Sequence, residues 1–155
     1  MTSEDALSEE MRDRLQQVLV ASAFRQLLGA ELASWGAGGA VVTVVPTGAH
    51  TNLAGAVHGG LLAAHVDCAV EVACNSWGRQ VVATGLALHL ASAAVVGEPL
   101  VATAREVTRS RRVASYDVVV VQAGRTVAWA QATAFRTDGW HLGEAAWPQE
   151  WRAAH

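Results

Sequence analysis

The sequence predicts a single α+β domain in which an antiparallel β-sheet wraps around one long helix. The first observation is an Ala-rich, proline-free and almost wholly apolar run from Gly59 to Asn75, which fits a buried helix. The second observation is the order of the segments around this run: two short β-like runs precede it and four longer ones follow. The length of 155 residues is ordinary for one domain, and 52% hydrophobic residues exclude disorder. We therefore expect residues 1–155 to form one unit.

An additional helix is predicted over about residues 8–28. Apolar residues recur there at helical spacing, at Met11, Leu15, Val18, Leu19, Leu27 and Leu28. Ser8 is the expected N-cap, and Gly29 is the expected residue after the C-cap. This helix precedes a core that we expect over about residues 30–137.

A hairpin is predicted next. The runs AELASW and AVVTVV are separated by the turn sequence GAGG and are followed by Pro46. Small and polar residues then form a loop from Thr47 to Val57, which leads directly into the central helix.

Four further strands are predicted after Gly78, over residues 81–92, 99–109, 112–124 and 125–137. Alternation is clear in the first of them, where Leu86, Leu88 and Leu90 face one way. The tail, residues 138–155, contains three tryptophans without a clear period and is expected to cover an edge. Such a sheet leaves its outer face or an edge available for dimerisation.

Composition excludes several classes of protein. The net charge is −3 and every basic residue is arginine, so no broad basic field predicts a nucleic-acid partner. No apolar stretch is long enough to span a bilayer, and MTSEDALSEE does not resemble a signal peptide. The sequence thus predicts a cytoplasmic protein. Cys68 and Cys74 are expected to be small buried side chains, and the scattered histidines predict no metal site.

The junction between the loop and the central helix has the features of an active site. The pair Gly59 and Gly60 lets a ligand approach backbone N–H groups at the positive end of the helix dipole, which suits an oxyanion hole. Asp67 lies eight residues beyond Gly59, about 12 Å further along the helix. One helix cannot bring both groups to the same carbonyl, so the spacing predicts a dimer with a shared site.

Asp67 itself is unusual in such an apolar stretch. An unpaired buried carboxylate costs several kcal/mol, so either a backbone N–H or an arginine such as Arg79 satisfies it, or its environment serves a function. Glu71 lies four residues further on, on nearly the same face, where it either assists Asp67 or pairs with an arginine. His65 is a further polar residue on this helix.

These residues carry a resemblance to a known family. The pattern N-x5-HGG-x6-D followed by ACNSxG, from Asn52 to Gly78, resembles the hotdog-fold acyl-CoA thioesterases of the phenylacetic-acid-degradation (PaaI) type. The resemblance continues through YDVVVV and TVAWAQATAF and covers about residues 24–137. It implies an antiparallel sheet around a central helix, hydrolysis of an acyl-CoA thioester, and homodimers that pair into homotetramers.

The resemblance also implies roles for individual residues. Asp67 matches the acidic residue that activates water or attacks the thioester, and Gly59 the residue whose N–H polarises the carbonyl. Asn52 matches the asparagine that positions the carbonyl or the water, and His58 is expected to shape the loop. Thr84 falls at the position where members of the family have a serine or threonine that holds the attacking water. In the family, the Asn/Gly side and the Asp/Thr side come from different subunits.

The substrate is expected to be a small or aromatic acyl thioester of coenzyme A or of a carrier protein, with no separate cofactor. Trp77 follows the central helix and is the tryptophan expected nearest the substrate. Gly60, at the start of the helix, is also expected to contact the substrate. Arg109, Arg111 and Arg112 lie at a predicted turn, where they either contact CoA phosphates or form a solvated surface.

Two other functions remain open at this point. A hotdog-fold enoyl-thioester hydratase or dehydratase uses a loop histidine with a helix carboxylate, which His58 and Asp67 resemble. A non-catalytic acyl-thioester-binding protein needs only the fold and the pocket.

Overall fold

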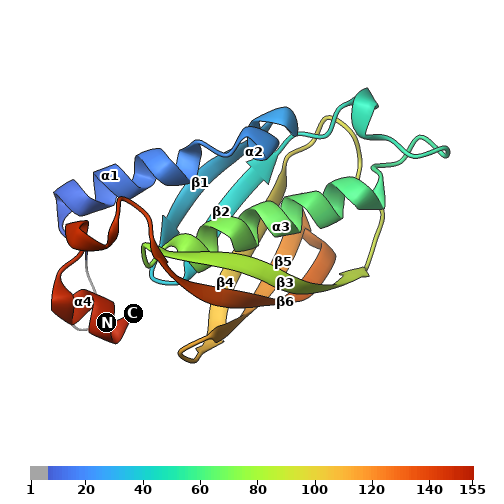
Figure 1. Cartoon of the computed structure of the whole chain (residues 1–155). Coiled ribbons are helices and arrows are strands. Elements are labelled where there is room, and N and C mark those ends of the chain that lie inside the picture. The colour runs from blue at the N-terminus through green and yellow to red at the C-terminus, as the bar shows by residue number, and fades with distance from the viewer. Residues whose placement is uncertain (1–6) are drawn as a thin grey trace.

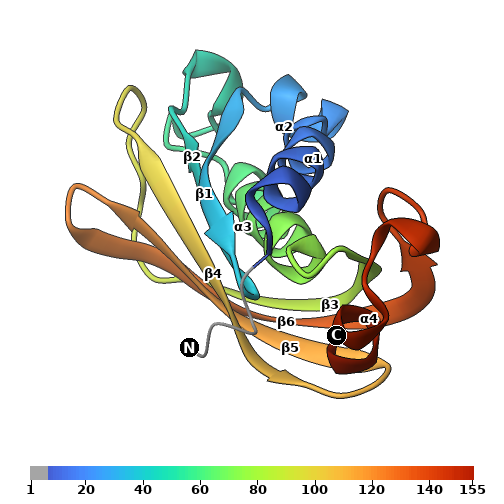
Figure 2. The same ribbon diagram turned by 90° about the vertical axis from the view of Figure 1, so that its left-hand side faces the viewer.

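The predicted α+β architecture is confirmed by the computed structural model, which describes residues 7–155. In this part of the chain, six antiparallel strands form one sheet in the order β1-β2-β4-β5-β6-β3. The helix α3 (Gly59–Asn75) lies in the concave face of the sheet, as Figures 1 and 2 show. The strands are β1 (Ala30–Gly36), β2 (Gly39–Val44), β3 (Arg79–Leu90), β4 (Leu100–Arg109), β5 (Val113–Gln122) and β6 (Arg125–Trp140).

The N-terminal segment differs from the single helix predicted over residues 8–28. It is divided into α1 (Glu9–Val20) and α2 (Ala23–Leu27). The division falls at Ser22, whose side chain accepts a hydrogen bond from the Arg25 N–H and so caps a new helix. Both predicted ends are confirmed, because Ser8 caps α1 and Gly29 follows α2 with a φ of 65°.

The core lies between α3 and the concave face of the sheet. Alternate residues of the central strands point toward the helix and are buried, among them Val42, Ala102, Ala104, Val118 and Val120. Small side chains on both surfaces allow the helix to pack closely, and α3 contacts β2, β3, β4 and β5. Cys68 and Cys74 are buried free thiols, as predicted.

The central helix is not buried on every side, although a helix as apolar all round as this one is normally buried on all of them. Gly60, Asp67 and Glu71 are exposed, and Ala63 and Ala64 are half-buried. These residues recur at helical spacing, so they form one open stripe along α3. The stripe is open because the sheet covers only the opposite side of the helix.

The edge strand β3 is also largely exposed. It pairs with β6 on one side, and its other edge has no strand partner within residues 7–155. Of the three leucines predicted to share a face, Leu86 and Leu90 are therefore exposed, and Leu88 is half-buried.

The C-terminal tail begins later than predicted, because β6 continues to Trp140 instead of ending near residue 137. The short helices η3 (Glu144–Ala146) and α4 (Gln149–Ala154) follow it. They bring Trp147 and Trp151 against the turn after α3, where Gly78 has a φ of +83°. A Cβ atom at residue 78 would lie 2.0 Å from the Trp147 ring, so only glycine fits.

Candidate active site

The loop before α3 is held in shape by its own polar groups. Asn52 Oδ1 accepts hydrogen bonds from the N–H groups of Ala54 (2.9 Å) and Ala56 (3.2 Å). The Asn52 N–H in turn donates to the Ala56 carbonyl at 2.8 Å. The side-chain oxygen is thus occupied, whereas the Nδ2 group has no hydrogen-bond partner among the described residues. Asn52 therefore presents a fixed donor.

His58 caps the start of α3. Its Nδ1 atom accepts a hydrogen bond from the Gly60 N–H at 2.8 Å, and its carbonyl accepts one from the Leu61 N–H at 3.0 Å. The Gly59 N–H is left without a partner within residues 7–155. A free N–H at the positive end of a helix of 17 residues is a donor suited to a developing oxyanion.

Asp67 lies on the open stripe of α3, eight residues beyond Gly59. It borders a cavity of about 560 Å³ between α3, β3 and Phe24 of α2. Partial desolvation there raises the pKa of the Asp67 carboxyl above its ordinary value of 3.8. In the described part of the chain, Asp67 has neither a hydrogen bond nor an ion pair, and Arg79 pairs with Asp138 instead (3.3 Å). Its carboxylate is available to a substrate.

Glu71 pairs with an arginine, the second of the two roles considered for it. Its carboxylate lies 3.6 Å from the guanidinium of Arg25, and it accepts a hydrogen bond from the Ser22 hydroxyl at 3.4 Å. Arg25 is only 2% exposed and also donates to the Leu19 carbonyl. Glu71 thus anchors α2 to α3.

Thr84 lies at a β-bulge in β3. The register with β6 shifts between Ala83 and Gly85, so Thr84 is the extra residue. Its hydroxyl lies 3.2 Å from the Thr133 carbonyl, to which it donates, and 3.3 Å from the Thr133 hydroxyl. Ala83 borders the Asp67 cavity, which places the bulge beside that cavity.

His65 points away from the open stripe into the core. It is fully buried, and within residues 7–155 neither ring nitrogen makes a hydrogen bond of ordinary geometry, although the Leu100 backbone interacts with the ring and partly offsets the effect of burial. Desolvation lowers its pKa from 6.5 to about 4. His65 is therefore a neutral core residue rather than part of the Asp67 environment.

The remaining predicted residues lie at the opposite end of α3. The Trp77 Nε1–H donates to Glu106 at 3.0 Å, and the Arg109 guanidinium lies 4.2 Å from the centre of its ring. Arg112 donates two hydrogen bonds to Asp138, at 2.9 and 3.0 Å. Arg111 alone of the three arginines has no partner in the described chain.

The structure therefore separates the predicted residues into three groups within one chain. Asn52, His58, Gly59 and Gly60 surround the start of α3, Asp67 lies near its middle with Thr84 on β3, and the other residues lie beyond its end. About 12 Å of helix separate Gly59 from Asp67. One chain does not assemble the predicted catalytic set.

Several residues that line the Asp67 cavity were not predicted. Phe24, Asn75 and His141 are among them, and His141 Nε2 lies 2.8 Å from Asn75 Oδ1. That oxygen already accepts from the Val81 N–H at 3.0 Å, so His141 is the donor in this pair. Of these three, Asn75 had a sequence signal, because it belongs to the ACNSxG run.

Neither a metal centre nor a membrane span is found in residues 7–155. No group of three His, Cys, Asp or Glu side chains is arranged to hold a metal ion. No helix in this range is long and apolar enough to cross a bilayer.

Comparison with known proteins agrees with the fold and the loop–helix motif. The family model of the Thioesterase superfamily matches residues 54–128. The acyl-coenzyme A thioesterase PaaI of Escherichia coli is 34% identical over 119 residues, covering 76% of this chain and 85% of that protein. The chain belongs to the hotdog-fold thioesterases of the PaaI type, as the sequence motif predicted.

Solved structures support the same assignment. The PaaI protein of Escherichia coli superposes with a TM-score of 0.82 at 28% identity, covering 88% of this chain and 99% of that one. A hypothetical thioesterase of Streptococcus pneumoniae, solved with coenzyme A, gives a TM-score of 0.71 at 26% identity. The superposition covers 84% of this chain and 98% of the chain from Streptococcus pneumoniae. The segment matched by the family model ends before β6 does, so the tryptophan-rich tail lies outside it.

Proposed function

We propose that the protein is an acyl-CoA thioesterase that hydrolyses a small or aromatic acyl-CoA to the free acid and coenzyme A. The relative from Escherichia coli is named an acyl-coenzyme A thioesterase, and the one from Streptococcus pneumoniae was solved with coenzyme A. The observation that carries the proposal is the pair of unused groups on α3. The Gly59 N–H and the Asp67 carboxylate are both without partners in the described chain, although each is placed to meet a ligand.

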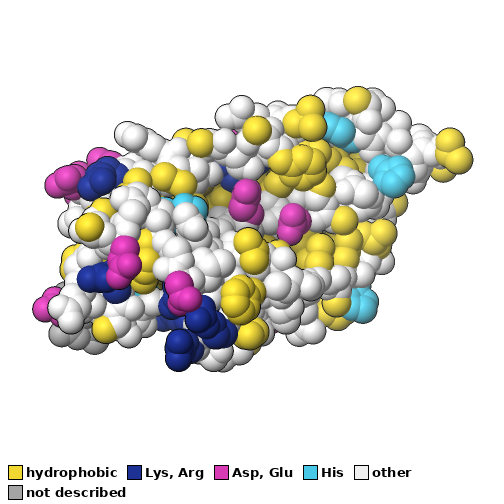
Figure 3. Space-filling model, in the orientation of Figure 1, with side chains coloured by type: hydrophobic (Ala, Val, Ile, Leu, Met, Phe, Trp, Pro, Cys, Tyr) yellow, Lys and Arg dark blue, Asp and Glu magenta, His cyan; other side chains and the backbone are white. Residues whose placement is uncertain are grey.

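A second copy of the chain would complete the site. Apolar side chains are exposed where it would pack, on the face formed by α2, α3 and β3, namely Phe24, Val82, Leu86 and Leu90. Leu53 is fully exposed on the loop before α3. Hydrophobic side chains gather over the part of this face nearest the start of α3 (Figure 3). Exposed apolar surface together with a free strand edge is typical of a subunit interface.

In such a dimer, the loop of one protomer would meet Asp67 of its partner. The thioester carbonyl oxygen would accept a hydrogen bond from the Gly59 N–H, with the Asn52 amide as a further donor. Asp67 would then remove a proton from a water molecule that Thr84 helps to hold. Water oxygen bonds to the carbonyl carbon, the C–S bond breaks, and the proton passes to the leaving thiolate.

Asp67 can alternatively attack the carbonyl carbon directly. An anhydride would then form as the thiolate leaves, and water would hydrolyse it in a second step. Repeated turnover in ¹⁸O-labelled water, followed by mass spectrometry of the protein, detects the anhydride route when water attacks the Asp67 side of the anhydride. Label in the Asp67 carboxylate would establish the anhydride, because general-base catalysis leaves the protein unlabelled.

The hydratase alternative is less well supported by the loop geometry. A histidine base needs a free ring nitrogen, but His58 Nδ1 already accepts the Gly60 N–H. In the neutral ring the proton is therefore on Nε2, which leaves no free acceptor. We expect enoyl-CoA hydration to be undetectable. A purely binding role would leave the unpaired Asp67 carboxylate without a purpose.

The remaining partners are also proposals. Arg109 and Arg112 already pair with carboxylates, so Arg111 is the arginine of the cluster with a guanidinium free for a CoA phosphate.

A tetramer would need a second interface, and the outer face of the sheet exposes apolar residues that would let two dimers pair: Val107, Val113, Val119, Trp129 and Phe135. We place the protein in the cytoplasm, where acyl-CoA substrates occur.

The proposal is tested by thiol release from a panel of acyl-CoA substrates with the wild type, Asp67→Asn and Asp67→Ala. We expect turnover by both folded variants to fall at least about a hundredfold. Near-wild-type turnover by Asp67→Ala would exclude the proposed mechanism.

A further inference from the structure

The Asp67 cavity extends along α3 in one direction. The α3 residues that line it are Asp67 and residues that follow Asp67, up to Asn75 at the end of the helix. Asn75 lies eight residues beyond Asp67, about 12 Å along the helix. In the proposed dimer the partner would cover the open side of the cavity. An acyl group whose carbonyl lies at Asp67 would then extend along α3 toward Asn75.

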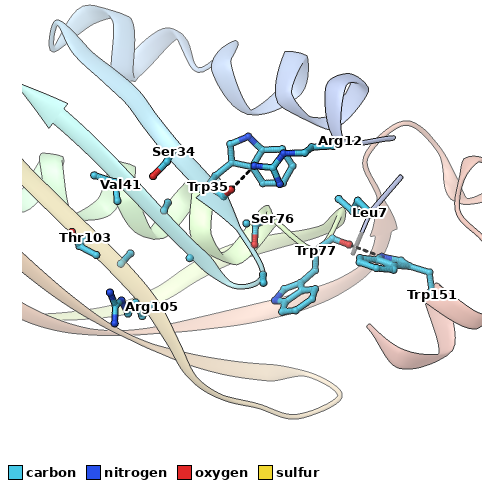
Figure 4. Close-up of a pocket in the computed structure, with 15 residues that line it drawn as sticks. Leu7, Arg12, Ser34, Trp35, Val41, Ser76, Trp77, Thr103, Arg105 and Trp151 are labelled. Carbon is cyan, nitrogen blue, oxygen red and sulfur yellow. Dashed lines mark hydrogen bonds between the residues drawn. The ribbon is translucent and has the colours of Figure 1, made fainter. Parts of the chain in front are cut away.

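A smaller cavity, of about 170 Å³, adjoins the far end of the Asp67 cavity. Glu71, Asn75 and His141 line both cavities, so these three side chains form a partition between them. Within residues 7–155, the cavity of about 600 Å³ at the tip of the β1–β2 hairpin shares no lining residue with either (Figure 4). Apart from Ser22, the other residues of the smaller cavity are apolar: Val18, Leu19, Ala21 and Val72. An apolar space thus continues behind a polar partition.

Two members of the partition are held in place on α3 itself. Asn75 Nδ2 donates to the Glu71 carbonyl at 2.9 Å and to the Val81 carbonyl at 3.1 Å, and its Oδ1 accepts from the Val81 N–H at 3.0 Å. The Glu71 carboxylate lies 3.6 Å from the Arg25 guanidinium. His141 is the member that comes from another part of the chain, and its ring reaches the partition through the Nε2–Asn75 hydrogen bond.

The backbone of His141 is fixed independently of its side chain. Its N–H donates to the Gly78 carbonyl at 2.9 Å, and its carbonyl accepts from the Trp147 Nε1–H at 2.6 Å. Removal of the ring therefore opens the partition without releasing the chain. His141 also follows the segment matched by the family model, which ends at residue 128, so the fourth side of this cavity belongs to the tail.

We propose that His141 limits the length of the acyl group by closing the end of the Asp67 cavity. The inference rests on the proposed function, because it takes the acyl group of the thioester as the ligand of this cavity. An unbranched chain with C–C bonds of about 1.52 Å extends by about 1.25 Å per carbon, so about nine carbons reach from Asp67 to Asn75. A longer chain meets the His141 ring. Without the ring the chain enters the smaller cavity, where each further buried methylene strengthens binding about fourfold.

The probes are S-octyl-CoA and S-dodecyl-CoA, thioethers that bind without being hydrolysed, titrated into the full-length protein by isothermal calorimetry. We expect the wild type to bind the dodecyl compound no more tightly than the octyl compound. His141→Ala should bind the dodecyl compound at least about tenfold more tightly than the octyl compound. Val18→Phe, which fills the smaller cavity, should remove this gain when added to His141→Ala.

Two matched controls separate the size of the ring from other effects. His141→Gln keeps a donor for Asn75 and much of the length of the side chain, so it should retain the wild-type preference. His89→Ala removes an exposed histidine that stacks on Trp129, outside both cavities, and should do the same. Circular dichroism of each variant excludes unfolding as the cause of a change.

Several results would overturn the inference. They are a wild type that binds neither thioether, a wild type that already prefers the dodecyl compound about tenfold, and the same preference in His141→Ala as in the wild type. An equal shift in His89→Ala would overturn it as well, by making the effect unspecific. Failure of the proposed function is a different result, namely binding of S-octyl-CoA without hydrolysis of octanoyl-CoA, and the thioether titrations then still decide the role of His141.

Discussion

The Nδ1 atom of His58 accepts the Gly60 N–H at 2.8 Å, and this single bond determines which amide at the start of α3 is left for a ligand. Gly60 is engaged, Leu61 donates to the His58 carbonyl, and Gly59 is free. His58 thus acts as an N-cap, a role in which asparagine or aspartate is more usual.

His58→Ala should therefore weaken both the fold and the reaction. We expect the free energy of unfolding to fall by about 1 kcal/mol, because the Gly60 N–H loses its acceptor. Thioesterase kcat/KM should fall about tenfold as the Gly59 N–H loses its fixed direction. His58→Asn restores a capping oxygen and should recover most of both losses. Urea unfolding and thiol release measure them, and full activity in His58→Ala would contradict the positioning role.

The pKa of Asp67 predicts the pH dependence of activity. Desolvation raises it above 3.8, and a general base or nucleophile must be deprotonated. The acid limb of kcat/KM should therefore have its midpoint above that of an ordinary carboxyl group and should be absent from the residual activity of Asp67→Asn. An identical acid limb in Asp67→Asn would assign the titration to another group.

The same raised pKa has a consequence for stability. The folded protein binds a proton at Asp67 more readily than the unfolded chain does, so the charged form opposes folding at neutral pH. Asp67→Asn should consequently be more stable than the wild type at pH 7 and should lose this advantage at low pH. Thermal melts at both pH values test the expectation, and a less stable variant at pH 7 would contradict it.

Because His65 is buried, the free energy of unfolding should fall in mild acid. Burial lowers its pKa from 6.5 to about 4, so the unfolded chain takes up a proton before the folded protein does. Stability should fall as the pH drops from about 6.5 to 4, by up to about 3 kcal/mol, since one pKa unit corresponds to about 1.4 kcal/mol. His65→Leu should remove this dependence. Urea unfolding at several pH values measures it, and the same slope in both proteins would refute the assignment.

Variants of Glu71 test whether its carboxylate is structural, in contrast to the catalytic role proposed for Asp67. Because Arg25 is buried beside it, Glu71→Ala should destabilise the protein by about 1–3 kcal/mol, whereas Glu71→Gln should cost less. Neither change should lower kcat by more than a few-fold in the folded protein. A hundredfold loss of kcat in stable Glu71→Gln would instead make Glu71 a partner of Asp67.

The fold followed closely from the sequence, because each strand had its own period or turn signal and α3 was continuous from Gly59 to Asn75. The exposure of Asp67 did not follow, since apolar composition shows that a helix is buried but not which side the sheet leaves open. The break at Ser22 was missed because the apolar spacing continues on both sides of it.

The site was predicted in part. The loop and the start of α3 were recognisable from the HGG motif, and the distance between Gly59 and Asp67 followed from helix geometry. The same geometry indicates that Trp77, eighteen residues after Gly59, lies at the far end of α3. Its pairing with Glu106, and that of Arg112 with Asp138, required the tertiary structure because these residues are distant in sequence.

The account requires that each active site take its loop from one protomer and its carboxylate from the other. Two variants should each be inactive alone: Asp67→Asn, and Asn52→Asp, which keeps the Oδ1 atom but removes the Nδ2 donor. Mixed by co-expression or by refolding together, they form heterodimers with one intact site and one doubly altered site. The most direct measurement is the thioesterase activity of this mixture. A shared site predicts recovery to about a quarter of the wild-type value, whereas a mixture as inactive as its two components would contradict it.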